Sequence, residues 1–326
     1  MKKVDVRALG ATVTRKYGIY LVAVCVVILG SVLSPHFFTV GNFLSVARQI
    51  SITGILAFAE TLIIISGCTD LSLGAQVAFA GVLGMDAYLA TGHSFLIAIL
   101  VAMAVACCCG LFNGIMVTKV GLAPFIATLA MDMIARGSAY LYTGGNPIYQ
   151  TEGFSKISQA TVLSIPVPVL FLLGVMLVCW ILLRTTRYGR QLFAVGGNQE
   201  AARASGISIV KTRVIAYLIA SAFTGIAAVL QMARINAGMP DTAQGYHGDA
   251  IAAAVVGGTA FGGGVGTAQG TLVGALIIGL INNILNLMSV NSNWQLVAKG
   301  AIILFAIILD SQSEKILERQ RLRALK

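Results

Sequence analysis

Four ionisable side chains lie within segments of the chain that are otherwise apolar, namely Glu60, Asp86, Asp132 and Arg136. An ionisable group inside a membrane-spanning segment is rare, and it is a functional candidate by default. Asp132 and Arg136 are four residues apart, so on a helix they can pair on one face and largely neutralise each other. Such a pair fits a structural role as well as contact with a solute. Glu60 and Asp86 have no evident partner, which fits a neutral carboxyl or a side chain that faces water.

Three amides, Asn282, Asn283 and Asn286, lie within one apolar segment near the C-terminal end of the chain. They could line a polar conduit, or they could hydrogen-bond neighbouring helices. The second interpretation is slightly favoured, because amide bonds between membrane helices are common.

The patterns of the common catalytic and metal sites are missing. The three histidines show no HExxH or other paired-ligand spacing, and the chain contains neither GxSxG nor Gly-Lys-Ser/Thr. The six cysteines lie in or beside apolar segments, which favours small buried residues over a metal site or disulfides. We expect no enzyme activity, no metal and no cofactor. If ATP drives the protein, the ATP and its magnesium ion bind to a separate polypeptide.

The composition is that of an integral membrane protein. Hydrophobic residues make up 57% of the 326 residues and charged residues only 10%, whereas soluble domains average roughly 25% charged residues. The net charge of +10 comes from Lys and Arg at the ends of apolar segments. Because no basic patch is interleaved with aromatic residues, this charge indicates membrane topology rather than binding to nucleic acid.

Ten apolar segments approach the length of about 20 residues that a membrane-spanning helix needs. We predict an all-α protein with helices over Gly18–Ser34, Ile50–Ser66, Leu71–Ala90, Ser94–Thr118, Leu122–Thr143, Pro166–Leu183, Val214–Met232, Asp249–Phe261, Thr267–Val290 and Gln295–Asp310. The predicted divisions are a cytoplasmic N-terminal segment (1–17), one transmembrane domain (18–310) and a basic cytoplasmic tail (311–326).

The distribution of basic residues orients these segments. The polar stretch 184–213 contains six Lys and Arg residues against one acid, Glu200, so the excess of positive charge assigns it to the cytoplasm. With ten spans, both termini are then also cytoplasmic, and most of the 22 Lys and Arg residues fall on that side. The N-terminal segment shows no cleavage site and is interpreted as the start of an uncleaved first helix.

The stretch 184–213 contains a predicted short helix. Asn198 can cap it, Glu200 in the first turn suits the positive end of the helix dipole, and the helix should stop near Gly206. Glycine-rich segments flank it on both sides. A docking element for another protein and an ordinary solvated connector are equally compatible with this spacing.

Two interruptions break the apolar segments. The eighth segment, 249–261, has 13 residues and spans about 20 Å, too short to cross a hydrocarbon core of about 30 Å. Asp249 is a good N-cap for this segment, and a glycine-rich stretch ends it. Such backbone lies at membrane depth only inside protein or beside a wet cavity, so it indicates a transport path. At 67–74, Thr69 or Asp70 could cap the following helix, although a tight turn explains most of that stretch.

Five stretches taken together resemble the permease subunit of bacterial ABC importers for monosaccharides, the ribose, xylose, arabinose and galactose group. The resemblance covers nearly the whole chain in unbroken order. The stretches are SGCTDLSLGA (66–75), APFIATLAM (123–131), Arg136-Gly137 with YTGGNPI (142–148), YGRQLFAVGGNQEAARASGI (188–207) and DAIAAAVVGGTAFGGGVGTAQG (249–270).

The resemblance implies half of a type II importer. Two permeases, identical or paralogous, lie side by side, an ATPase binds below and an extracytoplasmic solute-binding protein binds above. The cytoplasmic loop helix is expected to seat in the ATPase. The positions that fall on this coupling motif are Gly196, Gly197, Asn198, Glu200, Ala201, Ala202, Gly206 and Ile207. We add Arg190, which could contact an acidic rim of the ATPase.

Two positions depart from the family pattern. The chain reads Tyr246-His247-Gly248-Asp249-Ala250 where the family usually has Tyr-Glu-Leu-Asp-Ala, and Asp132 stands where an uncharged residue is expected. Both could signal an unusual solute, so ribose itself is not implied.

The leading hypothesis is an ATP-driven import permease for a monosaccharide or similar polyol. A sugar costs energy to desolvate, so its path needs some polar lining and weak binding. The residues assigned to that path are Asp70, Ser72, Asp132, Arg136, Asn282, Asn283 and Asn286. The alternative is a stand-alone secondary carrier or channel that uses Asp132, Arg136 and Glu60 for ion coupling. An intramembrane enzyme is a distant third, because no nucleophile, base and orienting group can be assembled.

Overall fold

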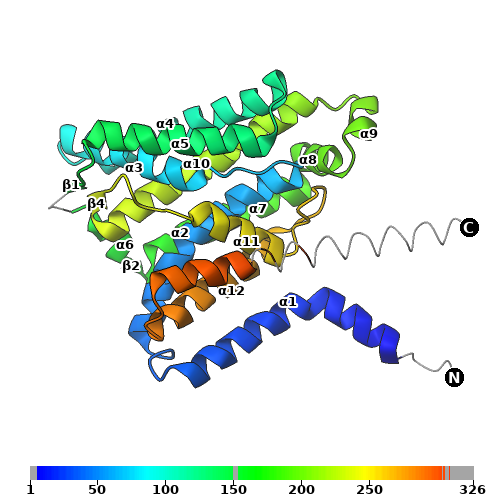
Figure 1. Cartoon of the computed structure of the whole chain (residues 1–326), viewed down its shortest axis with the longest axis horizontal. Coiled ribbons are helices and arrows are strands. Elements are labelled where there is room, and N and C mark those ends of the chain that lie inside the picture. Colours follow the sequence, from blue (N-terminus) through cyan, green and yellow to red (C-terminus); the bar gives the residue numbers. More distant parts are fainter. Residues whose placement is uncertain (1–5, 150–152, 303, 305–307, 309–326) are drawn as a thin grey trace, which may run out of the picture.

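The computed structural model describes residues 6–149, 153–302, 304 and 308, without the side chains of residues 6–17. The predicted tail (311–326), the first five residues and the end of the tenth predicted span lie outside the described residues. The described chain is a bundle of helices whose long axes run in broadly the same direction (Figure 1). The long helices are α1 (Val6–Leu33), α2 (Val40–Ile65), α3 (Leu73–Ala90), α4 (Phe95–Ile115), α5 (Pro124–Thr143), α7 (Val167–Thr185), α10 (Ile209–Ile235) and α12 (Ala268–Leu287).

Short elements connect the long helices. A π-helical turn η1 (Met116–Val120) continues α4, and residues 292–302 are helical after α12. Two pairs of two-residue antiparallel strands occur, β1 (Ile148–Tyr149) with β4 (Ala237–Gly238) and β2 (Thr161–Val162) with β3 (Ile165–Pro166). The short helices are α6 (Ser155–Gln159), α8 (Arg187–Gly197), α9 (Gln199–Ala204) and α11 (Tyr246–Val256).

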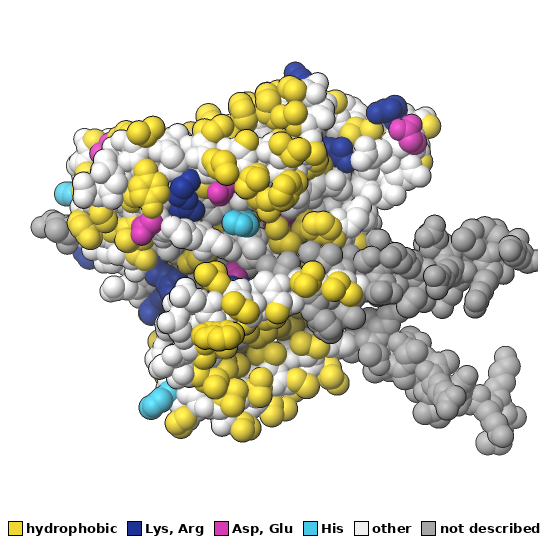
Figure 2. All heavy atoms as spheres, in the orientation of Figure 1, with side chains coloured by type: hydrophobic (Ala, Val, Ile, Leu, Met, Phe, Trp, Pro, Cys, Tyr) yellow, Lys and Arg dark blue, Asp and Glu magenta, His cyan; other side chains and the backbone are white. Residues whose placement is uncertain are grey.

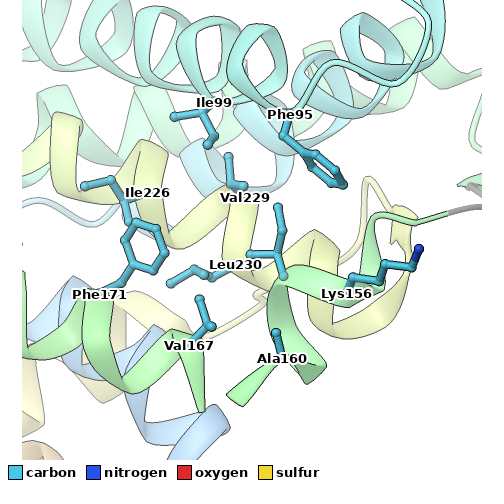
Figure 3. Close-up of a pocket in the computed structure, with 10 residues that line it drawn as sticks. Phe95, Ile99, Lys156, Ala160, Val167, Phe171, Ile226, Val229 and Leu230 are labelled. Carbon is cyan, nitrogen blue, oxygen red and sulfur yellow. The ribbon is translucent and has the colours of Figure 1, made fainter. Parts of the chain in front are cut away.

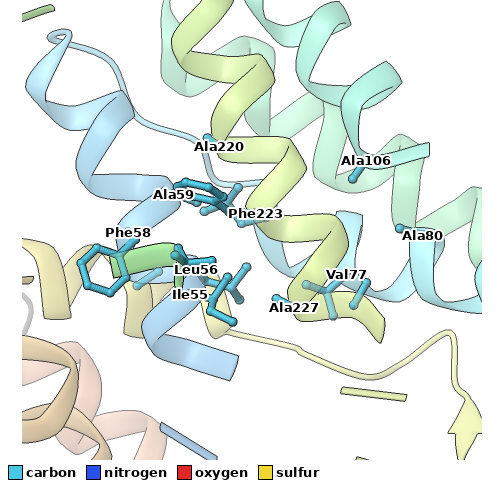
Figure 4. Packing of buried hydrophobic residues seen from close by; sticks show 14 of the residues in the cluster. Ile55, Leu56, Phe58, Ala59, Val77, Ala80, Ala106, Ala220, Phe223 and Ala227 are labelled. Atoms are coloured by element: carbon cyan, nitrogen blue, oxygen red, sulfur yellow. The ribbon is translucent and has the colours of Figure 1, made fainter. Parts of the chain in front are cut away.

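The core forms around α2 and α10. Within α2, the 18-residue window with the highest hydropathy is 89% buried. Small residues bring α10 against α4: a Cβ on Gly110 would lie 2.7 Å from the carbonyl oxygen of Tyr217, and one on Gly225 would lie 2.6 Å from the Cα of Met103. Side chains of α2, α3, α4 and α10 interlock between these helices (Figure 4). Close approach of helix backbones at small residues is the usual way in which membrane helices associate.

Six helices of the described chain are long and apolar enough to cross a membrane, namely α2, α3, α4 with η1, α7, α10 and α12. The prediction of a helical, multi-pass protein is confirmed. Of the remaining predicted spans, the first corresponds to the apolar part of α1 (Gly18–Leu33) and the fifth to α5. Helix α5 contains 20 residues, but Asp132 and Arg136 lower its hydropathy. The eighth is the 11-residue α11, and the tenth is only partly described.

The two ends of the bundle differ. Helices α8 and α9 project at one end, where α1 also begins, whereas α6, β1 and β4 lie at the opposite end (Figure 1). This arrangement places the polar stretch 184–213 at one extremity of the helical bundle, as a membrane orientation requires.

Candidate functional site

The projecting arm consists of two short helices, α8 and α9, that are separated by the single residue Asn198. In the first, α8, the Thr186 side chain accepts a hydrogen bond from the Gly189 N–H at 3.0 Å. In the second, α9, the Asn198 side chain accepts one from the Ala201 N–H at 3.0 Å. Glu200 lies in the first turn of α9, and Gly206 follows it with a left-handed φ of 77°. The predicted cap, first turn and end of the short helix are confirmed.

Helix α8 was not predicted, because its polar and glycine-rich residues were interpreted as a connector. It packs Gly189, Leu192 and Val195 inward. Tyr188 donates a hydrogen bond to the Thr212 carbonyl oxygen at 2.9 Å, and burial raises the pKa of this phenol, so it remains a neutral donor. The arm is therefore fixed to the start of α10.

The residues assigned to coupling are mostly exposed on this arm. Among them Ala202 is buried, and Gly196 and Ile207 are partly buried. Glu200 and Arg203 form an ion pair of 3.5 Å whose side chains are 83% and 68% exposed, so it adds little stability. Arg190 is exposed on α8. The outer surface of the arm is thus free of contacts with the rest of the described chain.

A cluster of glycines connects the arm to two other segments. A Cβ on Gly196 would lie 1.7 Å from the carbonyl oxygen of Ile65, the last residue of α2. The Gly264 N–H donates to the same carbonyl at 2.9 Å, and a Cβ on Gly264 would lie 2.6 Å from the Cα of Gly197. Gly264 has a left-handed φ of 73°. We call Gly67, Gly196, Gly197, Gly263 and Gly264 the glycine junction.

The glycine junction allows three backbones to touch. The arm, the end of α2 and the segment that follows α11 meet there without intervening side chains. Arg213 of α10 adds a hydrogen bond from its Nε to the Ser66 carbonyl oxygen at 3.1 Å. Because close-packed backbone resists compression, the arm cannot move toward the ends of α2 and of the α11 segment without displacing them.

Next to the junction, the chain folds back along α2 into a buried polar network. The Glu60 carboxylate accepts hydrogen bonds from the Thr69 hydroxyl at 2.8 Å and from the Asp70 N–H at 3.2 Å. Asp70 in turn accepts from the Ser72 N–H at 2.8 Å. The complete set, which we call the buried network, is Glu60, Thr69, Asp70, Ser72, Gln76, Asn113 and Ser221.

This network corrects two interpretations of the sequence. Glu60 has partners, but they come from a segment that returns beside α2. Neither Thr69 nor Asp70 is the N-cap of α3; Ser72 holds that position, and Asp70 binds its backbone instead. Asp70 and Ser72, both assigned to the solute path, are fully buried here. Gln76, Asn113 and Ser221 were not singled out in the sequence, because isolated amides and hydroxyls in apolar segments carry no distinctive spacing.

A different set of charges lies across α5 and the segment before α11. The Arg136 guanidinium donates to the carbonyl oxygens of Pro240 and Thr242 at 2.8 and 2.7 Å. The ion pairs formed within the described chain are Arg203–Glu200 and Lys299–Asp249. The predicted Asp132–Arg136 contact pair is therefore not formed, although the Asp132 charge acts on the Arg136 guanidinium. Both hydrogen bonds from Arg136 to these carbonyl oxygens have normal lengths.

His247 lies near Asp132 and Arg136. The charges of Asp132 and Arg136 act on its imidazole, and Asp132, Arg136 and His247 are all partly buried. Asp241 is exposed nearby and interacts with Arg136. We call Asp132, Arg136, Asp241 and His247 the partly exposed cluster. Figure 2 shows charged and histidine side chains between apolar areas on one face of the bundle. The two positions that depart from the family pattern, Asp132 and His247, therefore lie together.

The broken helix α11 begins earlier than predicted. Gly245, with a left-handed φ of 74°, precedes its first residue Tyr246. Asp249 is therefore not the N-cap. Its carboxylate is buried and forms an ion pair of 2.9 Å with Lys299 from the helical residues after α12. The Asn282 amide approaches the same carboxylate at 3.5 Å.

The other two amides of α12 also join helices. Asn283 and Asn42 of α2 exchange hydrogen bonds of 2.7 and 3.1 Å, and Asn286 accepts from Gln295 at 2.9 Å. In this structure the three amides thus bond to neighbouring segments, as the slightly favoured interpretation predicts. Asp86, for which the sequence showed no partner, accepts a hydrogen bond from the Tyr142 hydroxyl at 2.7 Å.

Comparisons with known proteins agree with this membrane architecture. Residues 42–307 match the family model described as the permease component of a branched-chain amino acid transport system. The chain belongs to this family, and it is a multi-pass permease of the inner membrane. No solved structure matches the chain.

Among the relatives is the ribose import permease protein RbsC of Bacillus subtilis, which is 39% identical over 301 residues, with 91% of this chain and 93% of the relative covered. RbsC of Escherichia coli is 36% identical, with 90% and 93% covered. The galactose/methyl galactoside import permease protein MglC of Escherichia coli is 32% identical, with 92% and 95% covered. These matches confirm the resemblance to monosaccharide import permeases that the sequence motifs indicate.

Proposed function

We propose that this chain is the permease subunit of an ATP-driven ABC importer that moves a monosaccharide or a similar polyol into the cell. Relatives that span almost the full chain are sugar import permeases by name. The observation that carries the proposal is the exposed arm, whose α9 is capped at Asn198 and attached by backbone contact at Gly196 to the end of α2.

In this proposal the ATPase is a separate subunit that binds the outer surface of α9 on the cytoplasmic side. The excess of Lys and Arg in residues 184–213 supports this cytoplasmic position of the arm. Closure of two ATPase units on ATP draws two arms together. The glycine junction then passes the movement to α2 and to the segment after α11, so that the spans tilt and open the path to alternate sides.

The proposed partners are an ABC ATPase with ATP and magnesium, an extracytoplasmic solute-binding protein and a second permease copy or paralogue. The solute passes the partly exposed cluster, whose carboxylates and imidazole can exchange hydrogen bonds with hydroxyl groups. Selectivity belongs mainly to the binding protein, because a tight site in the path would hold the solute.

The test uses vesicles that contain the assembled transporter with solute-binding protein. Glu200→Arg reverses the charge on the exposed face of α9, and we expect it to abolish uptake and the stimulation of ATPase activity while the binding protein still captures solute. Lys119→Glu is the matched control, because Lys119 is an exposed charge outside the arm. Wild-type uptake in Glu200→Arg would refute the docking role. Gradient-driven uptake by the chain alone, without ATPase, would instead identify a secondary carrier.

A further inference from the structure

A groove runs along one face of α7 and ends at a cation. Its α7 side is formed by Leu173, Met176, Leu177, Trp180 and Arg184, which are spaced three or four residues apart and so lie on one helix face. Two adjoining cavities of about 420 and 330 Å³ make up the groove, and both are lined by Trp180, Arg184 and Gln269.

The dimensions of the groove match one leaflet of a bilayer. Leu173 and Arg184 are separated by eleven helical residues, or about 16 Å along the axis. Half of the hydrocarbon core of a membrane is about 15 Å thick. Since Arg184 lies in the last turn of α7, the apolar part of the groove extends from near the middle of the membrane to its surface.

The chemistry changes along the groove. Leu173, Met176 and Leu177 provide an apolar floor, whereas Arg184, Gln269 and Thr267 provide polar groups at the membrane surface. The Arg184 guanidinium lies 5.4 Å from the centre of the Trp180 ring. No acidic side chain of the described residues forms an ion pair with it. A tryptophan at headgroup depth is typical of a membrane interface.

A second cavity beside α7 lacks the combination of an apolar wall and several polar groups that the groove at Arg184 has. It encloses about 400 Å³ at the opposite end of α7, between α4, α6 and α10, and its lining is apolar except for Lys156. In Figure 3 the Lys156 ammonium points away from the other lining side chains. This cavity fits an acyl chain or detergent, and its one lining cation, Lys156, is directed away from it.

We infer that the groove at Arg184 binds a phospholipid with an anionic headgroup. The guanidinium and the Gln269 amide would hold the phosphate oxygens, because charge-assisted hydrogen bonds from arginine to phosphate are strong and directional. One acyl chain would lie against Leu173 and Leu177. The assignment to the inner leaflet rests on the proposed orientation of the chain, whereas the choice of an anionic lipid rests on the groove itself.

Such a lipid would lie next to the coupling arm. Phe193 of α8 lines the polar end of the groove, together with Gly266 and Thr267 of the segment that connects α11 to α12. An occupied groove would therefore fill the space between α7, the arm and the start of α12. We expect the lipid to support the arm in the position from which it passes movement to α2.

The first test measures lipid retention by the purified chain. The chain is delipidated in mild detergent, offered phosphatidylglycerol, phosphatidylcholine or inorganic phosphate, and examined by native mass spectrometry. We expect wild type to retain phosphatidylglycerol in preference to the other two, and Arg184→Gln to retain about tenfold less of it. Arg184→Lys should keep most of the binding, Leu177→Trp should reduce it by filling the apolar part, and Lys119→Gln should bind as wild type.

Thermal unfolding of each variant shows whether the chain is folded, so that a loss of lipid is not mistaken for misfolding. Equal retention of phosphatidylglycerol by wild type and by folded Arg184→Gln would overturn the inference. So would equal retention of phosphatidylglycerol and phosphatidylcholine, binding of inorganic phosphate alone, or a groove that cross-linking shows to be covered by a second copy of the chain.

A second measurement connects the site to transport. In vesicles of the assembled transporter, phosphatidylglycerol should raise uptake by wild type and by Lys119→Gln, but not by Arg184→Gln. Because lipid retention is measured on the chain without ATPase or solute, it can succeed even if the proposed transport function fails. Failure of both retention and lipid stimulation would refute the site while leaving the proposed function intact.

Discussion

The buried network and the partly exposed cluster contain similar side chains in different surroundings. In the buried network, Glu60 and Asp70 are completely enclosed and accept hydrogen bonds from backbone and side chains. In the partly exposed cluster, Asp132 and His247 are only partly buried, and Asp241 is exposed. A buried carboxylate that loses its partners is strongly destabilising, whereas a solvated one is not. The first region therefore fixes the junction between α2 and α3, and the second is available to a solute.

The largest effect is expected from Asp70→Ala. It leaves the Ser72 N–H without its buried acceptor and removes one of the two acceptors of the Gln76 and Asn113 amides, so we expect the free energy of unfolding to fall by about 3 kcal/mol or more. Thermal unfolding in detergent measures this loss. Asp132→Ala is the matched control, and its effect should stay within about 0.5 kcal/mol. Equal losses for the two variants would remove the distinction between the regions.

The Asp249–Lys299 ion pair at α11 tests the distinction between buried and solvated carboxylates at a third carboxylate. Lys299→Met leaves the buried Asp249 without its cation, and we expect a loss of about 2–4 kcal/mol because an uncompensated buried charge remains. Adding Asp249→Asn should restore part of the stability, since the charge is then removed as well. Thermal unfolding of the single and double variants gives the coupling between the two residues. A double variant no more stable than Lys299→Met would mean that the ion pair is not responsible.

The glycine junction offers a comparison between neighbouring residues. Gly196→Ala forces a Cβ against the Ile65 carbonyl, whereas a Cβ on Gly197 meets nothing within 4 Å. We expect Gly196→Ala to destabilise the chain by about 1–3 kcal/mol and to lower uptake relative to ATP hydrolysis in vesicles. Gly197→Ala should leave the stability close to wild type. If Gly196→Ala retains tight coupling, the junction does not transmit the movement of the arm.

The smallest effect on stability, but a clear effect on transport, is expected for Asp132→Asn. The side chain is partly buried and forms no ion pair within the described residues, so stability should change by less than about 0.5 kcal/mol. If Asp132 contacts the passing solute, the uptake rate should fall at constant ATPase activity. Uptake by wild-type and variant vesicles at saturating binding protein measures this. Unchanged uptake would assign the partly exposed cluster a structural role only.

Features set by neighbouring residues could be predicted from the sequence. The span of α9 followed from Asn198 and Glu200, because a cap and a helix dipole act within one turn. The shortness of α11 followed from the glycines after it. Its start did not, because Gly245 in a left-handed conformation began the helix before Asp249. Helix α8 was missed because its buried residues are few and lie between polar ones.

The sequence by itself determined the membrane class and the capped helix of the arm, since hydropathy and capping depend on residues close together in the chain. Only the tertiary structure decided which polar groups became partners. Glu60 binds a returning segment, Arg136 binds the carbonyls of Pro240 and Thr242, and Asp249 pairs with Lys299. The physical reason is that a buried charge takes whichever partner packing brings within hydrogen-bonding distance, and that distance is not encoded by spacing along the chain.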